Sequence, residues 1–525
     1  MTPVEHPASL IALRARYGAR YRWLLLLAVM VGTMASIMSS TIVNVAIPGM
    51  SQHFALDQAR AQWVTSGFMV AMTVAMLTTP WLLARYGYRH TYVACMALLM
   101  AGGLVGGFAT RFDLVLAARV AEGLAAGVVQ PIPAIIILRA FEPEEQGRAS
   151  GIFGMGVVLA PAIGPSIGGL LVDWFGWRSI FFMVVPFCLA SFWLAHRFVP
   201  VTAPGGIAAR RDGAALDWAG LALASAGTLC LLNGLVELRG ANALAAGVLL
   251  ALAAAALLAF VALQRHLLRR RAASGREPLM NLRVFVHRAF AMGSIVAFIY
   301  GTALFGSTYL LPVYMQMGLN LSAANVGIIL LPAGLILAVT IAIVGRLADR
   351  QPTRRLVSIG LALLAASFAG MATIGPASGI GLLVGWEILG RIGLGFILPS
   401  LNLGSMRGLD STLIAQGSSA ISFLRMLGGS VGVSLCAIAL EWRLAAHGDS
   451  LASVMAGPGR LAAFNEVFLG LAALCALAIV AARQLNPFGR HDAPRQPALH
   501  AGGRGPPHLP RSDLPLKARF GDERR

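Results

Sequence analysis

Charged side chains inside long apolar stretches are the residues of this sequence that could do chemistry. Arg119 and Glu122 lie three residues apart in one such stretch, and Glu387 and Arg391 lie four apart in another. On a helix these spacings place each acid beside its arginine, and pairing offsets the cost of two charges in a low-dielectric interior. One interpretation is a structural ion pair. The other is a carboxylate that exchanges a proton between an arginine-paired and a solvent-facing environment.

A stripe of small and polar residues runs along the first apolar stretch. Its members recur every fourth residue or lie beside that series: Gly32, Ser36, Ser39, Ser40, Thr41, Asn44 and Pro48. Polar groups that face lipid are costly, so we expect this stripe to face the protein interior. There it either lines a cavity or forms hydrogen bonds between helices. Gln130 and Arg425, each inside an apolar stretch, are further cavity candidates, and Arg425 needs an interior partner.

A ladder of small residues marks the fifth apolar stretch. The small residues and the two prolines among them are Gly156, Ala160, Pro161, Gly164, Pro165, Gly168 and Gly169. Small residues four positions apart let two membrane helices approach closely, and proline removes a backbone donor and bends its helix. One interpretation is ordinary tight packing. The other is a contact that takes part in a conformational change.

The composition indicates a membrane protein. Of the 525 residues, 57% are hydrophobic and 12% are charged, whereas a soluble protein carries about 25% charged residues. A larger core does not explain the difference, because soluble cores stop growing at about 250–300 residues. The net charge of +19 comes from arginines in short segments between apolar stretches and in the tails. That placement is a topology signal rather than a nucleic-acid-binding surface.

The sequence lacks the motifs of an enzyme. Its five cysteines are scattered through apolar stretches, at spacings that suggest neither a metal site nor a disulfide framework. Phosphate-binding glycine loops and clustered metal ligands are absent as well. We therefore expect no enzymatic activity, no cofactor and no metal. Without a nucleotide-binding motif, the protein is either driven by an ion gradient or a uniporter.

Fourteen stretches of the sequence are long and apolar enough to cross a membrane, which takes about 20 residues. They lie near 22–47, 61–83, 90–110, 113–139, 150–172, 178–198, 216–236, 243–264, 288–313, 325–345, 355–375, 379–405, 414–441 and 462–483. Arginines concentrate in alternate loops, for example at Arg85, Arg139, Arg148 and Arg346. Since basic loops stay in the cytoplasm, these loops and both termini are predicted to be cytoplasmic.

The first six and the last six stretches share two sequence features. Both sets carry a short basic loop after their second stretch, at 83–89 and 345–350, and Arg-x-x-x-Gly in their fourth, at 119–123 and 391–395. Weak internal symmetry of this kind is typical of secondary transporters built from repeats. Stretches seven and eight remain as an inserted pair.

The predicted fold class is therefore an all-α polytopic membrane protein. Its segments are a cytoplasmic N-terminal segment (1–21), an N-terminal six-helix bundle (22–198), inserted helices seven and eight (216–264), a basic cytoplasmic loop (265–287), a C-terminal six-helix bundle (288–483) and a disordered cytoplasmic tail (484–525). The tail is rich in proline, glycine, arginine and histidine, a composition that buries too little apolar surface to fold.

Several segments resemble the major facilitator superfamily, specifically its 14-spanner drug:proton antiporter family of EmrB/QacA type. The segments that carry the resemblance are 41–48 (TIVNVAIP), 119–127 (RVAEGLAAG), 164–169 (GPSIGG), 177–186, 217–220 (DWAG) and 309–316 (YLLPVYMQ). The resemblance implies the major facilitator fold with 14 transmembrane helices, and drug or toxic-metabolite efflux driven by inward proton flow. In Gram-negative bacteria it also implies a periplasmic adaptor and an outer-membrane channel.

Two departures from the family pattern concern the interior acids. The first-span acid of the family falls at Ser39, so a carboxylate tied to proton coupling and to recognition of cations is missing. The fourth-span glutamine falls at Glu122, which adds an acid nearby. We therefore expect Glu122 to be the principal proton carrier, with Glu387 in second place.

Two further departures lie outside these spans. The acid of the first basic loop falls at Ala84, whereas Asp349 keeps it in the second loop. The second loop, with Gly345, Asp349 and Arg350, is therefore the candidate cytoplasmic gate. Val184 stands where the family has an asparagine.

The leading functional prediction is proton-coupled efflux of lipophilic drugs or toxic compounds across the bacterial inner membrane. The alternatives are an exporter of an endogenous metabolite, siderophore or fatty acid, and a non-transporting sensor or scaffold, because a fold does not fix a substrate. The expected partners are a small lipophilic substrate, protons and the lipid bilayer, and no nucleic acid. Three interior arginines face two interior glutamates, which favours an anionic or neutral substrate over a dication.

Overall fold

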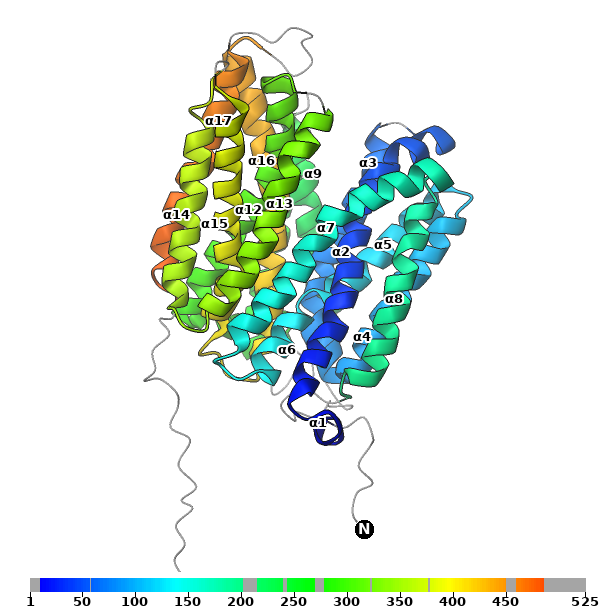
Figure 1. Ribbon diagram of the computed structural model, residues 1–525. Helices are drawn as coiled ribbons and strands as arrows, with labels where there is room; N and C mark the ends of the chain where they lie inside the picture. The colour runs from blue at the N-terminus through cyan, green and yellow to red at the C-terminus, as the bar shows by residue number, and fades with distance from the viewer. Residues whose placement is uncertain are drawn as a thin grey trace, which may run out of the picture. The chain divides into compact units, whose positions relative to one another are not determined.

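The computed structural model describes residues 10–56, 58–201, 215–238, 243–269, 278–321, 323–375, 378–449 and 459–485, and they form a bundle of long α-helices (Figure 1). In chain order the helices are α1 (Leu10–Tyr17), α2 (Tyr21–Phe54), α3 (Gln58–Ala75), α4 (Thr79–Phe108), α5 (Phe112–Val129), α6 (Ile132–Ala140), α7 (Gln146–Phe175), α8 (Ser179–Phe198), α9 (Trp218–Glu237), α10 (Ala243–Arg269), α12 (Arg288–Val313), α13 (Ala323–Leu347), α14 (Thr353–Met371), α15 (Ile380–Met406), α16 (Ile414–Ala446) and α17 (Arg460–Ala482). Short helical turns include η2 (Met76–Thr78) and η3 (Leu282–Val286).

Twelve helical stretches of the described residues are long and apolar enough to cross a membrane. The longest, Trp63–Phe108, contains two predicted stretches, because Gly87 interrupts α4 with φ 79° and ψ 173°. That backbone region is open almost only to glycine. Helix α7, of 30 residues, covers one more predicted stretch. Each of the fourteen predicted stretches therefore coincides with a helix, and the all-α fold is confirmed.

Helices α5 and α6 form one membrane crossing with a break. Val129 ends α5 and Ile132 begins α6, and Pro131 between them has no N–H with which to continue the helix. At this break the carbonyl oxygen of Pro131 accepts a hydrogen bond (2.8 Å) from the Ser418 hydroxyl of α16. The break thus joins segments that lie 287 positions apart in the chain.

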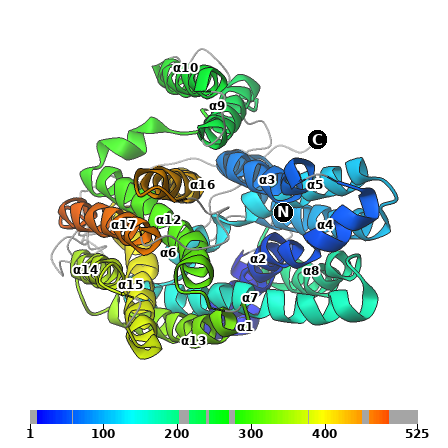
Figure 2. The same ribbon diagram turned by 90° about the horizontal axis from the view of Figure 1, so that it is seen from above.

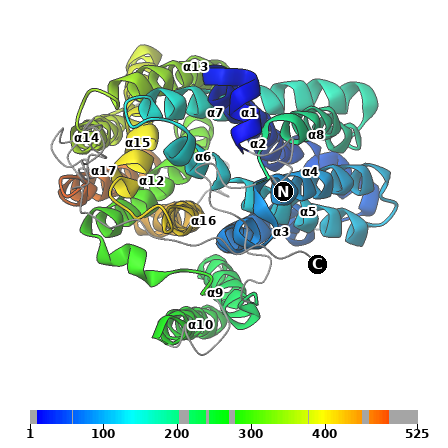
Figure 3. The ribbon, with the colours of Figure 1, turned by 90° about the horizontal axis from the view of Figure 1, so that it is seen from below.

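The helices pack around separate apolar cores. Helices α2, α4, α5, α6 and α8 share one core, which includes Leu25 and Tyr92. Helices α12 to α17 surround a second, which includes Leu361 and Phe464. Helices α9 and α10 pack mainly on each other, and α9 also contacts α3 and α16 (Figures 2 and 3).

Glycines of the two Arg-x-x-x-Gly motifs make corresponding close approaches. A Cβ added to Gly123 of α5 would lie 2.4 Å from the Phe68 carbonyl oxygen of α3. A Cβ added to Gly395 of α15 would lie 2.7 Å from the Thr340 side chain of α13. In each set the fourth span therefore packs against the second at a position that only glycine fits, as in close helix pairs of membrane proteins.

Much of both terminal segments and of the basic loop lies outside the described residues: residues 1–9 of the N-terminal segment, 270–277 of the basic loop and 486–525 of the tail. The predictions for these parts, and the boundaries of the two halves and the inserted pair, stay predictions.

Candidate coupling and transport site

Ser39, Arg119 and Glu122 form a buried cluster between α2 and α5. Arg119 Nη1 lies 2.5 Å from Glu122 Oε2 and donates a hydrogen bond to Ser39 Oγ (2.9 Å). The Ser39 hydroxyl donates in turn to Glu122 Oε2 (3.0 Å). All three residues are 1% exposed. The ion pair expected from the spacing is present, and the serine in place of the family's acid is its third member.

Backbone and aromatic groups hold the Arg119 guanidinium in place. Its Nη1 also donates to the Ser39 carbonyl oxygen (3.1 Å), and its Nε donates to the Val64 carbonyl oxygen (3.3 Å). The guanidinium lies over the Phe68 ring, 4.3 Å from the ring centroid. These contacts add to the acid in stabilising a cation inside the membrane.

One oxygen of Glu122 has no partner. Glu122 Oε1 is buried and forms no hydrogen bond with any described residue. Beside the cluster lies a narrow gap lined by the apolar side chains of Ile42, Val43, Ile180, Phe181 and Val184. The gap is too narrow for a water molecule. The valine at the family's asparagine position therefore offers this oxygen nothing to bind, and such buried, unsatisfied groups mark functional sites.

The second interior pair lies on α15. Glu387 Oε1 is 2.6 Å from Arg391 Nε, and the two side chains are 3% and 15% exposed. The ion pair expected from the i,i+4 spacing is present.

Arg425 of α16 has no acidic partner. Its side chain is partly buried and forms neither an ion pair nor a hydrogen bond within the described part of the chain. Gly301 of α12, the residue after Tyr300, packs against the Arg425 backbone. Among the described residues, the structure thus pairs two of the three interior arginines with glutamates and leaves Arg425 without an acid.

The buried part of the polar stripe on α2 does not line a cavity. A Cβ on Gly32 would lie 2.0 Å from the Tyr92 hydroxyl of α4, so this face is packed against α4. Ser36 is fully buried, and its hydroxyl has no partner among the described residues. The Ser40 hydroxyl bonds the Ile37 carbonyl of its own helix (2.7 Å).

The remaining cavity candidates lie in more open surroundings. Asn44 is exposed, and its side-chain oxygen accepts a hydrogen bond (3.1 Å) from the Thr65 hydroxyl of α3. Thr41 and Gln130 are partly buried, and Gln130 lies at the break between α5 and α6. The accessible part of the stripe is therefore its C-terminal end.

The small-residue ladder of α7 packs against α2. A Cβ on Gly168 would lie 2.4 Å from Ile42 Cγ1, and one on Gly156 would lie 2.7 Å from Met30 Sδ. A Cβ on Gly164 meets only ordinary contact distances, 3.4 Å or more. Of the glycines in the ladder, Gly156 and Gly168 are therefore the ones that pack most closely on side chains of α2.

The other members of the ladder differ among themselves. Ala160 is buried, whereas nothing lies within 4 Å of a Cβ built on Gly169. Helix α7 runs on through Pro161 and Pro165, whose side chains lie outside the described part of the structure.

Asp349 joins α13 to α7 at the end of the bundle that carries the basic loops. Its carboxylate accepts the backbone N–H groups of Gly147 (2.5 Å) and Arg148 (2.8 Å) in the first turn of α7. A carboxyl group can accept both hydrogen bonds here, because a helix N-terminus carries unpaired N–H groups. Beside it, a Cβ on Gly345 would lie 2.4 Å from the Gly151 Cα.

The surroundings of Asp349 also change its acidity. Burial raises the pKa of the Asp349 carboxyl above its usual range, while the two backbone N–H groups and Arg407 act in the opposite direction. Burial lowers the pKa of Arg407 to about 10 against the attraction of Asp349. Of the three predicted gate residues, Gly345 and Asp349 contact α7, and Arg350 is exposed.

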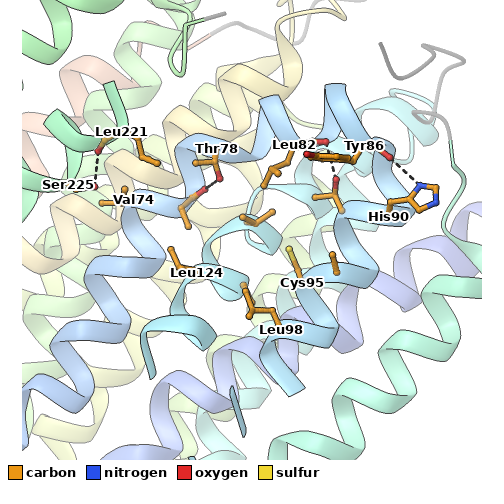
Figure 4. Close-up of a pocket in the computed structure, with 15 residues that line it drawn as sticks. Val74, Thr78, Leu82, Tyr86, His90, Cys95, Leu98, Leu124, Leu221 and Ser225 are labelled. Atoms are coloured by element: carbon orange, nitrogen blue, oxygen red, sulfur yellow. Dashed lines mark hydrogen bonds between the residues drawn. The ribbon is translucent and has the colours of Figure 1, made fainter. Parts of the chain in front are cut away.

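An apolar cavity of about 560 Å³ lies where α3, α4, α5 and α9 meet (Figure 4). Its walls are mostly apolar and include Leu82, Cys95, Leu98, Leu124 and Leu221. The hydroxyls of Thr78, Thr91 and Ser225 in its walls donate to backbone carbonyl oxygens, the last to that of Leu221 (2.7 Å). No residue predicted as a site residue lines this cavity.

Sequence reasoning missed two polar groups. Tyr300 is 3% exposed in the middle of α12, and its only sequence signal is a phenol inside an apolar stretch. In the sequence, Asp217 is marked only as part of the segment 217–220 (DWAG). Its carboxylate caps α9 by accepting the Gly220 N–H (2.8 Å), and it also accepts from Gln264 of α10 (2.7 Å). Asp217 thus ties the α9–α10 pair together.

The fold and the paired charges inside it define a polytopic membrane transporter. The Major Facilitator Superfamily profile matches residues 29–433, and the chain belongs to that superfamily.

Similar proteins agree with this assignment. The tetracenomycin C resistance and export protein of Streptomyces glaucescens is 30% identical over 424 residues, 80% of this chain and 76% of the relative. The multidrug export protein EmrB of Haemophilus influenzae is 27% identical over 429 residues, 82% of each chain. The solved proton:xylose symporter XylE has a TM-score of 0.63 at 12% identity and covers 88% of this chain and 95% of its own, a likeness of fold. These proteins are transporters, as the sequence predicted for this chain.

Proposed function

We propose that this chain exports small lipophilic compounds, including drugs and toxic metabolites, across the inner membrane of a bacterium in exchange for protons. Relatives named for multidrug export and for antibiotic resistance support efflux. The arginine-rich loops support an orientation in which they and both termini are cytoplasmic. A periplasmic adaptor and an outer-membrane channel would carry the substrate onward in a Gram-negative cell.

The observation that carries proton coupling is the state of Glu122. The carboxylate is buried inside the membrane region, holds Arg119 and Ser39 with one oxygen, and has no partner for the other. If Arg119 moves away, the carboxylate must take up a proton, because a lone charge in the membrane interior is costly. When Arg119 returns, the proton is released. Glu387 beside Arg391 is the second carboxylate that could work in this way.

Helix α7 connects this cluster to the rest of the protein. It packs on α2 through Gly156 and Gly168, and Ile42, which Gly168 contacts, lies one turn from Ser39. The same helix meets α13 through Asp349 and Gly345. A rocking of α13 against α7 would therefore move α2, and with it the hydroxyl that holds Glu122. Alternating access in transporters built from repeats works through such rigid-body motion.

Export of an endogenous metabolite is the second candidate. A relative named for resistance to and export of tetracenomycin C is 30% identical to this chain, and a fold does not select between a foreign and an endogenous compound.

The test is transport in everted membrane vesicles that contain the protein, with a fluorescent lipophilic dye as substrate. The proposal predicts dye uptake that requires an acidic vesicle interior and stops when nigericin removes the pH gradient. Uptake that continues without the gradient, or no uptake of any dye of a chemically varied set, contradicts it.

A further inference from the structure

The interior charges of the described residues do not balance. Arg119 is paired with Glu122 and Arg391 with Glu387, and each pair lies within 2.6 Å. Arg425 is the arginine left over, because it has no ion pair and no hydrogen bond from its side chain within the described residues. An uncompensated cation inside a membrane is unfavourable unless a counter-charge arrives. Arg425 therefore lacks a counter-charge among the described residues.

The second polar group at this place is the hydroxyl of Tyr300. Tyr300 is 3% exposed and forms no hydrogen bond with a described residue. It lies where α12 packs against α16 at Arg425, since a Cβ on its neighbour Gly301 would lie 2.0 Å from the Arg425 carbonyl oxygen. A guanidinium and a phenol at one helix contact are two donors that can bind one carboxylate.

A mostly buried apolar cluster adjoins Arg425, and Met69 and Phe305 are its partly exposed members. The next residue, Met426, packs in a cluster with side chains of α3, η2, α5 and α12: Phe68, Met69, Met72, Met76, Ala126 and Phe305. Methionine is flexible and polarisable, so surfaces rich in it adapt to ligands of different shape. The cluster joins helices of the first and second sets, and transporters bind their substrates at the interface between repeats.

We infer that Arg425 and Tyr300 bind the anionic group of the transported substrate, whose aromatic or aliphatic body rests on Met69 and Phe305, the partly exposed members of the cluster around Met426. The substrate class is then lipophilic organic acids. That the bound acid is also transported rests on the proposed function, whereas its binding to Arg425 and Tyr300 does not depend on proton coupling.

An inorganic anion such as chloride would also neutralise Arg425. It would leave the apolar surface unused, however, and would bind without regard to a hydrophobic body. Substituting gluconate for chloride in the buffer separates the two, since an organic acid that uses the apolar surface binds in both buffers.

The test uses the purified full chain in nanodiscs and three probes that share one ring system: 1-naphthoate, 1-naphthamide and 1-naphthylmethylammonium. At pH 7 the wild type should bind naphthoate at least about tenfold more tightly than either of the other two. Arg425→Gln should weaken naphthoate binding by about 10- to 100-fold, as expected for loss of a hydrogen bond between charged groups, and leave naphthamide unchanged. Arg425→Lys should keep part of the affinity, because it keeps the charge but not the fork of donors.

Two controls distinguish a role of Arg425 in ligand binding from a role in folding. Arg443→Gln removes an arginine from the outer part of the same helix and should not change naphthoate binding. Arg425→Gln should unfold at the same or a higher temperature than the wild type, because it removes an unpaired interior cation. A lower unfolding temperature together with equal loss of all three probes would overturn the inference.

Equal binding of naphthoate and naphthylmethylammonium by the wild type, or no binding of naphthoate, would overturn it too. Selective naphthoate binding without gradient-driven transport would instead contradict the proposed function and leave the anion site standing.

Discussion

The Ser39 hydroxyl donates a hydrogen bond to the Glu122 carboxylate across 3.0 Å, from a helix 83 positions earlier in the chain. The drug:proton antiporter family that this sequence resembles has an acid at the position of Ser39. In this chain the carboxylate stands on α5 instead, and the residue on α2 has become its hydrogen-bond donor. The ion pair of Arg119 and Glu122 is thereby linked to α2, the helix on which α7 packs.

Ser39→Ala should weaken the Arg119–Glu122 cluster. The change removes a hydrogen bond to a charged group, which contributes about 1.5–3 kcal/mol. We expect a lower free energy of unfolding in detergent and slower gradient-driven transport. Ser40→Ala is the matched control, because the Ser40 hydroxyl bonds only a carbonyl of its own helix, and it should change neither. Equal effects of the two variants would show that the bond from Ser39 to Glu122 is unimportant.

Gly168→Leu should abolish transport, whereas Gly169→Leu should not. A side chain at Gly168 collides with Ile42 of α2, while the space beside Gly169 is open. Both changes add the same bulk to adjacent positions of α7. The measurement is dye transport at matched expression, with expression itself read from a fluorescent fusion. Normal transport by Gly168→Leu would show that the small residues of α7 serve only ordinary helix packing.

Acidification should stabilise the contact between α13 and α7. The pKa of Asp349 is raised here above the 3.8 of a free carboxyl, so this arrangement binds the proton more tightly than one in which Asp349 faces water. Its stabilising effect is fully present below pH 3.8 and is lost as the pH rises through the raised value. Asp349→Asn should remove this dependence, and Asp113→Asn, an exposed aspartate at the other end, should not.

The measurement is the distance between spin labels on α7 and α13, taken by electron paramagnetic resonance as a function of pH. A population of the close state that does not change with pH in the wild type, or that changes equally in Asp349→Asn, would contradict the argument.

The sequence predicts which stretches form helices, but it says little about which helices pack against each other. Apolar length predicts all fourteen stretches, because each needs only local composition. The spacing of Arg119 and Glu122 predicts their ion pair for the same reason, since both lie on one helix. The bond from Ser39 depends on how α2 packs beside α5, and no local pattern contains that.

The polar stripe on α2 shows the limit of a periodicity argument. Its residues share one face of a 34-residue helix, so one environment was expected for all of them. The helix is long enough to pass through several environments: Gly32 is packed against Tyr92, Ser39 binds Glu122, and Asn44 is exposed. Periodicity gives the face of a helix, and tertiary packing decides what each part of that face meets.

Tyr300 illustrates the same limit for single residues. A tyrosine in an apolar stretch is ordinary, because its ring is apolar and only its hydroxyl needs a partner. Its importance follows from its place where α12 packs against α16 at Arg425, a contact between two helices that the sequence does not show.

The most direct test of proton coupling is a comparison of two transport modes in proteoliposomes that contain Glu122→Gln. Glutamine keeps the shape and one acceptor oxygen but carries no exchangeable acid proton. The account predicts that the variant still exchanges labelled substrate for unlabelled substrate across the membrane, yet no longer accumulates it in response to a pH gradient. Glu387→Gln, treated in the same way, should keep part of its gradient-driven accumulation. Accumulation by Glu122→Gln at the wild-type level would contradict the account and make the Arg119–Glu122 pair purely structural.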